Sequence, residues 1–347
     1  MSTTSPLARL LESKAPLSSE IEVHLFERCN LRCAFCGQDH DDDTGLASIR
    51  EKAKPILEFI RANPRRDHTI NLMGGELFAD DLPDEAFEAY ADLATKVARG
   101  ARELGHRCRF NWVTNFIFDR RDRVERLLAH LDEEGIPAFL ATSYDLHGRQ
   151  AGRWSIEVFR ANLEAFAHRV HTVGFVLTKP TIRALLADGD AFFRELYARY
   201  DLYFDYYVPE SGASALMPSD DEILSAYHFV AERYPRIQPV RDLLERERNA
   251  MTCYSLNKTT ILPDGRQVKC RYLTYKPGDF RHEVDATSNE NIIWGHLQEN
   301  ECLGCEFFGR CGFRCFVQAD WSKRQRREEC LFKDFFRRHP VRPAGSA

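Results

Sequence analysis

The stretch ERCNLRCAFCGQ, residues 27–38, places three cysteines within twelve positions, at Cys29, Cys33 and Cys36. It follows directly on a β-rich apolar run, IEVHLFE at 21–27. Four protein ligands close a structural metal site, whereas three leave one coordination position open. A four-iron cluster held by three thiolates therefore keeps one iron available to a ligand. The stretch predicts a metal-binding loop at the end of the first strand, with an open position for chemistry.

Outward from this loop, the chain alternates between two patterns. Amphipathic helical patterns lie at about 46–62, 84–104, 119–133, 155–169 and 181–199. The β-rich runs lie at 21–27, 68–73, 107–114, 137–142, 171–177 and 202–208. Strict alternation predicts an α/β fold with a parallel sheet, either open and doubly wound or a partial barrel. In both arrangements ligands bind at the carboxyl ends of the strands, where the three-cysteine loop begins.

The composition fits a soluble globular protein. The chain has 347 residues, of which 44% are hydrophobic and 29% are charged, enough for one large domain and a smaller one. A formal charge of −5, from 48 basic and 53 acidic residues, favours neither nucleic acid nor a membrane surface as a partner. Residues 1–19 carry no apolar signal segment, and no run approaches ~18 apolar residues. We therefore expect a cytoplasmic location.

Eleven cysteines in a reducing compartment favour metal or redox chemistry over disulfides. Cys108 stands alone on a β-rich run, which is typical of a small buried hydrophobic residue. The remaining cysteines form a second group near the C-terminus: Cys253, Cys270, Cys302, Cys305, Cys311, Cys315 and Cys330.

The order of these patterns predicts five segments. An N-terminal extension (1–19) precedes the β/α core (20–215), and a helical connector (216–250) follows it. From Cys253 onward, short β pieces and glycine turns replace periodic helices, so the segment 251–335 is expected to depend on bound metal for its fold. Residues 336–347 form a C-terminal tail.

The spacing Cys29-x3-Cys33-x2-Cys36, with Phe35 before the last cysteine, resembles the signature loop of radical S-adenosylmethionine (SAM) enzymes. The resemblance implies a partial (β/α)6 barrel of the TIM type and a [4Fe-4S] cluster whose open iron binds SAM. It also implies one-electron cleavage of SAM to a 5'-deoxyadenosyl radical, which abstracts a substrate hydrogen. A zinc site completed by His24 or His40 is the alternative for the three thiols.

Further residues at the same edge fit the resemblance. The stretch MGGEL at 73–77 is similar to the family's GGE motif, so Gly74, Gly75 and Glu76 are expected to hold the methionyl amine of SAM. Leu77 stands where many members have proline. Each of the remaining candidates has a surface or capping role as its alternative. The candidates for other SAM contacts are Thr114, Asn115, Ser143, Arg149 and Arg153.

The C-terminal cysteines resemble the SPASM extension of radical SAM enzymes, which binds two auxiliary iron-sulfur clusters. Position by position, the resemblance assigns the first cluster to Cys253, Cys270 and Cys315. It leaves that cluster one thiolate short. It assigns the second cluster to Cys302, Cys305, Cys311 and Cys330. A pair of zinc sites is the alternative.

The family leaves the reaction open. In sulfatase-maturating members an acidic residue follows the cysteine equivalent to Cys270, whereas this chain has Arg271, which is a poor base at neutral pH. Tyr206, Tyr207, Glu210 and Arg271 are the candidate polar groups near the substrate. About 20 residues precede the first strand, fewer than the peptide-recognition domain of many relatives requires.

We expect a radical SAM oxidoreductase that oxidises, crosslinks or epimerises a peptide, supplied with electrons by a donor such as flavodoxin or ferredoxin. A dehydrogenase or epimerase of a small natural-product intermediate, such as an amino sugar, is the first alternative. A non-catalytic, zinc-stabilised binding module is the second.

Overall fold

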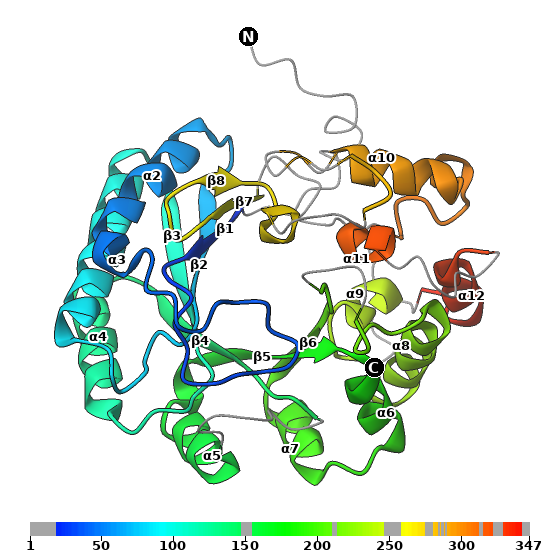
Figure 1. The fold of residues 1–347 in the computed structure, drawn as a ribbon, viewed down its shortest axis with the longest axis horizontal. Coiled ribbons are helices and arrows are strands. Elements are labelled where there is room, and N and C mark those ends of the chain that lie inside the picture. The colour runs from blue at the N-terminus through cyan, green and yellow to red at the C-terminus, as the bar shows by residue number, and fades with distance from the viewer. Residues whose placement is uncertain are drawn as a thin grey trace.

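A computed structural model describes residues 19–146, 155–209, 214–245, 258–274, 280–283, 285, 288, 290–311, 315–321 and 329–341. Eight strands within these residues form one curved sheet in the order β6-β5-β4-β3-β2-β1-β7-β8. Figure 1 shows the strands curling, with the helices outside them. The strands are β1 (Ser19–His24), β2 (Asp67–Met73), β3 (Arg107–Val113), β4 (Ala138–Ser143), β5 (Val170–Leu177), β6 (Asp201–Tyr206), β7 (Lys258–Ile261) and β8 (Gln267–Val268).

The first six strands confirm the predicted parallel sheet. They pair in sequence order, for example Ile21 with Ile70 between β1 and β2. The sheet continues beyond the prediction, because β7 pairs in parallel with the other edge of β1, Ile21 lying opposite Thr259. β8 then returns antiparallel to β7. The cysteine-rich part of the chain thus adds its first strands to the edge of the core sheet. The five segment boundaries remain a prediction.

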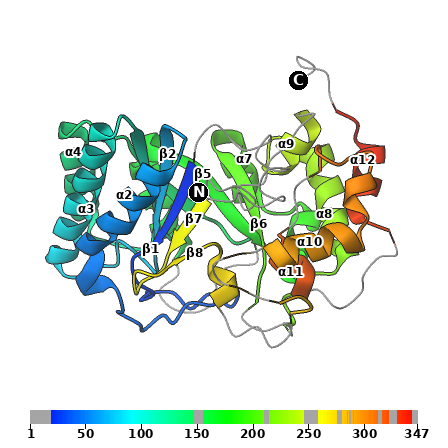
Figure 2. The ribbon, with the colours of Figure 1, turned by 90° about the horizontal axis from the view of Figure 1, so that it is seen from above.

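Helices cover the outer face of the sheet and meet a continuous apolar layer. On β1 the outward side chains Ile21 and Val23 are fully buried against them. Figure 2 shows α2 to α4 at one end of the molecule, near β1 and β2, and α8 with α10 to α12 at the other end, beyond β6. The helical elements up to residue 245 are η1 (Leu46–Lys52), α2 (Ala53–Ala62), α3 (Asp84–Glu103), α4 (Arg121–Glu133), α5 (Ile156–Ala165), η2 (Ala167–Arg169), α6 (Lys179–Ala187), α7 (Ala191–Arg199), α8 (Asp220–Arg233) and α9 (Val240–Glu245).

Two expectations about helices were wrong. The single helix expected over 181–199 is two, because Asp188 takes a left-handed conformation at the end of α6 and Asp190 caps α7. Helices also return after residue 253, as α10 (Glu290–Glu299), α11 (Phe316–Trp321) and α12 (Leu331–Arg338). They are short, so each gives a weak periodic signal. α12 is held by packing, since Phe332 and Phe335 contact Tyr227 of α8.

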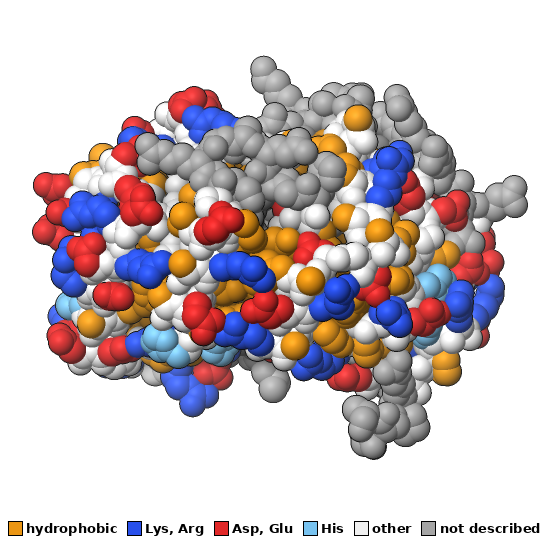
Figure 3. All heavy atoms as spheres, turned by 90° about the horizontal axis from the view of Figure 1, so that it is seen from below, with side chains coloured by type: hydrophobic (Ala, Val, Ile, Leu, Met, Phe, Trp, Pro, Cys, Tyr) orange, Lys and Arg blue, Asp and Glu red, His pale blue; other side chains and the backbone are white. Residues whose placement is uncertain are grey.

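The charges on the surface are mixed, as the balanced composition leads one to expect. Figure 3 shows basic and acidic side chains intermingled over one face, with apolar atoms between them. Among the described residues, no helix has the length and apolar content needed to cross a membrane.

Candidate functional site

The three-cysteine loop leaves the carboxyl end of β1 and is fixed by its own backbone. The Cys29 N–H donates to the His40 carbonyl at 2.9 Å, and the Cys36 N–H donates to the Cys33 carbonyl at 3.0 Å. The side chain of Gln38 reaches across to the end of β2, where its Nε2 donates to the Gly74 carbonyl at 2.6 Å. These bonds hold the thiol-bearing loop beside the Gly-Gly-Glu turn.

Gly75 lets the two loops touch. A Cβ atom at Gly75 would lie 1.8 Å from the Arg28 carbonyl oxygen, so no other residue fits without moving the cysteine loop. The contact is closed by hydrogen bonds, since the Gly75 N–H donates to the Phe26 carbonyl and the Glu76 N–H to the Arg28 carbonyl, both at 3.0 Å. The glycine pair therefore provides a backbone-to-backbone joint between the ends of β1 and β2.

Glu76 extends this joint to β3. Its carboxylate is fully buried and accepts hydrogen bonds from the Thr114 hydroxyl at 2.7 Å, the Asn115 N–H at 2.6 Å and the Phe78 N–H at 2.9 Å. A buried carboxylate needs such donors, because burial removes its hydrogen bonds to water. The side chain expected to bind an amine is thus engaged with the protein itself.

Asn115 brings β3 to the thiols. Its Nδ2 lies 3.8 Å from the Cys29 sulfur and donates to the Asn30 side-chain oxygen at 2.8 Å. Asn30 in turn donates to the Ile117 carbonyl at 2.6 Å. Sequence reasoning selected Asn115 but missed Asn30 and Gln38, although both lie within the twelve-residue stretch and carry amides.

The environment of Cys29 disfavours a free thiolate. Burial, the Glu76 carboxylate and the neighbouring thiols Cys33 and Cys36 raise the pKa of Cys29 to about 12. A cationic metal group would reverse this, because it stabilises thiolate against both desolvation and like charge. The donor set thus fits a cluster held by Cys29, Cys33 and Cys36.

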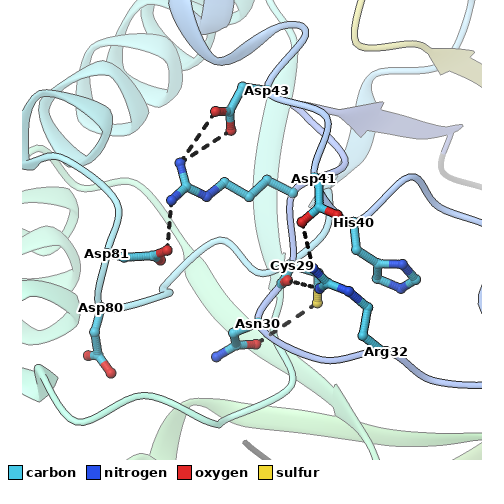
Figure 4. A pocket seen from close by; sticks show the side chains of 9 residues that line it. Cys29, Asn30, Arg32, His40, Asp41, Asp43, Asp80 and Asp81 are labelled. Atoms are coloured by element: carbon cyan, nitrogen blue, oxygen red, sulfur yellow. Dashed lines mark hydrogen bonds and ion pairs between the residues drawn. The ribbon is translucent and has the colours of Figure 1, made fainter. Parts of the chain in front are cut away.

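A pocket of about 640 Å³ opens beside Cys29 (Figure 4). Its charges are largely paired: Arg28 contacts Asp81 at 2.7 Å and Asp43 at 3.4 Å, and Arg32 contacts Asp41 at 2.6 Å. The lining residues are Arg28, Cys29, Asn30, Arg32, His40, Asp41, Asp43, Asp80 and Asp81.

The C-terminal region gathers four thiols into one group. The thiol of Cys311 interacts electrostatically with those of Cys302, Cys305 and Cys330. Burial and the neighbouring thiols Cys330 and Cys305 raise the pKa of Cys302 to about 12. These are the same four residues that the resemblance assigns to the second auxiliary cluster.

The cysteines assigned to the first auxiliary cluster are only partly within the described residues. Cys270 and Cys315 both pack against a small apolar cluster that includes Val208, Leu273 and Ile292, while Cys253 lies outside the described residues. Within the described part of the chain, no three His, Cys, Asp or Glu side chains are close enough to hold a single metal ion. Thiolates around a cubic cluster are spaced more widely than those around one ion. Cys108 is half-buried and packs against the main core.

The remaining candidates are scattered. Ser143 ends β4 opposite Gly174 of β5, and Phe35 is half-buried in the cysteine loop. The Tyr207 hydroxyl contacts the Ser214 hydroxyl at 3.0 Å, and that of Tyr206 contacts Tyr227. Arg271 begins η4 (Arg271–Thr274). Three of the candidates, Arg149, Arg153 and Glu210, lie outside the described residues.

Solved structures of anSMEcpe, a radical SAM/SPASM enzyme, share this fold. Its complex with AdoMet and the Cp18Cys peptide matches with a TM-score of 0.59 and 18% identity, over 92% of this chain and 95% of that one. The complex with AdoMet and the Kp18Cys peptide gives 0.58 and 17%, over 91% and 96%. No protein-family model matches the chain, and no curated protein matches it. The expected fold, a partial barrel of the radical SAM type with a cysteine-rich C-terminal region, is confirmed.

Proposed function

We propose that this chain is a radical SAM oxidoreductase with auxiliary clusters, which abstracts a hydrogen atom from a peptide and so oxidises, crosslinks or epimerises it. One observation carries the proposal: the three-cysteine loop is joined to the Gly-Gly-Glu turn at the mouth of a partial barrel, through Gly75 and Glu76.

Cys29, Cys33 and Cys36 would hold a [4Fe-4S] cluster. When bound there, the cluster supplies the single electron that cleaves SAM reductively. The protein's own side chains position the loops that would hold the cluster and SAM. Glu76 fixes the ends of β2 and β3, and Asn115, fixed in turn by Glu76, directs its amide towards the Cys29 sulfur. Gly74, Thr114 and Ser143 lie at neighbouring strand ends and remain the proposed SAM contacts, together with Arg149 and Arg153.

The C-terminal cysteines would hold the auxiliary clusters. The electrostatic grouping of Cys302, Cys305, Cys311 and Cys330 supports one four-thiolate site. Cys253, Cys270 and Cys315 are the proposed ligands of the other. Such sites can accept the electron that a substrate radical loses during oxidation.

A peptide substrate is supported by the likeness to anSMEcpe, whose structures contain bound peptides. Tyr207 and Glu210 remain the proposed polar groups near the substrate, and Arg271 remains a charged neighbour that is unsuited to act as a base. A flavodoxin or ferredoxin would supply electrons.

The test is anaerobic reconstitution with iron and sulfide, followed by addition of SAM and dithionite. We expect 5'-deoxyadenosine by chromatography, a paramagnetic signal that changes with SAM, and about eight or more irons per chain. Cys33→Ala should abolish cleavage, while Cys108→Ser, outside both cysteine groups, should retain it. Undiminished cleavage by Cys33→Ala would refute the assignment. A colourless, zinc-containing protein would favour the binding-module alternative.

A further inference from the structure

The inner face of the curved sheet is polar. Along β1, Ile21 and Val23 point outward into the apolar layer, so Glu20, Glu22 and His24 point inward. Closed eight-stranded barrels fill their interior with bulky branched side chains, whereas this open sheet carries charged ones on its inner face. Charged groups in that position are costly unless protein partners, water or a ligand satisfy them. Some of these inward groups have hydrogen-bond or charge partners in the protein, and others do not.

The charges near the β1–β7 edge are mostly satisfied. Glu22 accepts from Lys258 at 2.7 Å and from the Thr260 hydroxyl at 3.0 Å, so the lysine charge is matched. Glu20 accepts from the Asn71 amide at 2.8 Å and has no ion pair among the described residues. The charge of Glu20 is thus hydrogen-bonded but not neutralised.

Asp205 on β6 is not satisfied. Among the described residues its carboxylate has no hydrogen bond and no ion pair, and its side chain is exposed to solvent on the inner face although protein surrounds it. It is attracted by Lys258 and repelled by Glu22 and Glu20, which lie on β7 and β1 at the other side of the sheet. The carboxylate therefore faces across the barrel. Burial, the largest cause, raises its pKa to about 6.

His24 is the second unsatisfied group. It is 1% exposed, and its Nε2 is buried and has no hydrogen-bond partner in the part of the chain that the structure describes. Burial and the positive charge of Arg271 lower its pKa to about 3, so the ring is neutral and can accept a hydrogen bond. Glu22 and Lys258 also act on it, with opposite signs. His24 ends β1, at the edge from which the cysteine loop departs.

We propose that Asp205 and His24 form a subsite for a positively charged nitrogen of the substrate, an ammonium or guanidinium group. Glu20 and Asp205 are two inward carboxylates without a cation, whereas the charge of Lys258 is already matched by Glu22. The charge of Arg271 acts on His24 and would repel a cation there, so the cation would sit against Asp205, with His24 Nε2 as a further acceptor on the inner face. The group can belong to a lysine or arginine side chain of a peptide, or to the amine of an amino sugar. The inference rests on the proposed function only in taking this ligand to be the substrate.

The test measures binding and needs no turnover. Acetylated, amidated pentapeptides that differ only at the central residue, lysine, norleucine or acetyl-lysine, are titrated calorimetrically into the reconstituted protein at pH 7.5. Glucosamine and glucose form a second pair. Since a hydrogen bond to a charged group contributes about 1.5 kcal/mol or more, the cationic member of at least one pair should bind about tenfold tighter or better. The pair that shows the preference identifies the source of the cation.

Asp205→Asn should remove the preference, because the amide keeps the shape but loses the charge. Asp201→Asn is the matched control: Asp201 lies on the same strand, contacts Arg241 at 3.4 Å and should leave the preference intact. Equal binding of charged and neutral members, absence of binding by both cations, or a preference that survives in Asp205→Asn would each overturn the inference. A preference seen without any 5'-deoxyadenosine would uphold the subsite while refuting the proposed function.

Discussion

The Glu76 carboxylate accepts a hydrogen bond from the Thr114 hydroxyl at 2.7 Å, and through it the end of β2 is tied to the end of β3. Glu76 is fully buried, so this tie is made without competition from water. Because the Glu76 N–H also bonds to the cysteine loop, one residue links three successive strand ends. The position of the thiols thus depends on a residue that carries none.

Replacing Glu76 should therefore lower the stability of the fold. Glu76→Gln puts an amide NH2 where donors already point, leaving at least one buried donor unpaired, and we expect the free energy of unfolding to fall by about 3 kcal/mol. Thr114→Val removes the hydroxyl donor and also the acceptor of the buried Phe116 N–H, which lies 3.1 Å from Thr114 Oγ1, so it should cost about 2 kcal/mol. Urea unfolding at pH 7.5 measures both. A loss within about 0.5 kcal/mol for Glu76→Gln, the range of ordinary surface substitutions, would contradict the tie.

Gly75→Ala should displace the cysteine loop. The new methyl group would meet the Arg28 carbonyl oxygen at 1.8 Å, so backbone must move, and overpacking of this kind costs about 1–3 kcal/mol. We expect the variant to take up less iron on reconstitution. Gly189→Ala is the control, since its methyl group would meet nothing within 4 Å. Equal iron contents in the two variants would show that the joint does not position the thiols.

The four grouped C-terminal thiols predict a selective loss of iron. Cys311→Ser removes the most enclosed member of the group, and we expect a reconstituted chain that lacks about one cluster's iron. Cys108→Ser changes a cysteine outside both groups and should keep the full content. Iron and sulfide analysis, with the absorption spectrum, makes the comparison. Full iron content in Cys311→Ser would exclude Cys311 as a ligand.

A chain of polar side chains at the opposite end of the sheet predicts acid sensitivity. Ser19 Oγ lies 2.5 Å from His68 Nδ1, and His68 Nε2 lies 2.8 Å from His106 Nδ1. Burial and the charge of His106 lower the pKa of His68 to about 4 from 6.5. Between about pH 4 and pH 6.5, the imidazole of His68 therefore binds a proton in the unfolded chain but not in the folded chain.

Stability should accordingly fall as the pH drops from about 6.5 to about 4, by about 3 kcal/mol from His68 alone. His68→Gln should flatten this part of the profile, whereas His130→Gln, at an exposed position of α4, should not. Urea midpoints measured between pH 7.5 and pH 4.5 test the sign. An unchanged slope in His68→Gln would assign the acid sensitivity elsewhere.

The sequence predicted the local features and missed the non-local ones. The six β-rich runs fall within about three residues of β1 to β6, because short runs of β-branched and aromatic residues between helical patterns mark strands locally. The pairing of β7 with β1 joins Lys258 to Glu22 across 236 positions, and a four-residue strand carries no pattern that announces its partner.

The candidate site divides in the same way. The resemblance to the SPASM extension assigned Cys302, Cys305, Cys311 and Cys330 to one cluster, and these four thiols interact electrostatically. Spacing alone would have placed Cys315 beside Cys311, because the two assigned sets interleave along the chain. Two of the three donors to Glu76, Thr114 and Asn115, come from the end of β3, far from Glu76 in the sequence, so sequence reasoning took its carboxylate to be available. Asp205 was overlooked because LYFDYY reads as an aromatic strand, and only the curvature of the sheet makes that carboxylate face Lys258.

Asp205 should reduce stability at neutral pH. Its folded pKa, about 6, lies above the ordinary 3.8, so the folded chain holds the proton more tightly than the unfolded chain does. The stability that this provides is complete below about pH 3.8 and is lost as the pH rises to about 6. Above pH 6 the ionised carboxylate is a net cost, which a ligand-binding site can retain.

Asp205→Asn removes that cost. We expect the variant to be more stable than the parent at pH 7.5, with the difference shrinking as the pH falls to about 4. Asp201→Asn, whose exposed carboxylate pairs with Arg241, should show no such gain. Urea unfolding of the three proteins at both pH values measures the differences. If Asp205→Asn were less stable than the parent at pH 7.5, the carboxylate would be satisfied within the protein, and its role as an acceptor for a substrate cation would be lost with it.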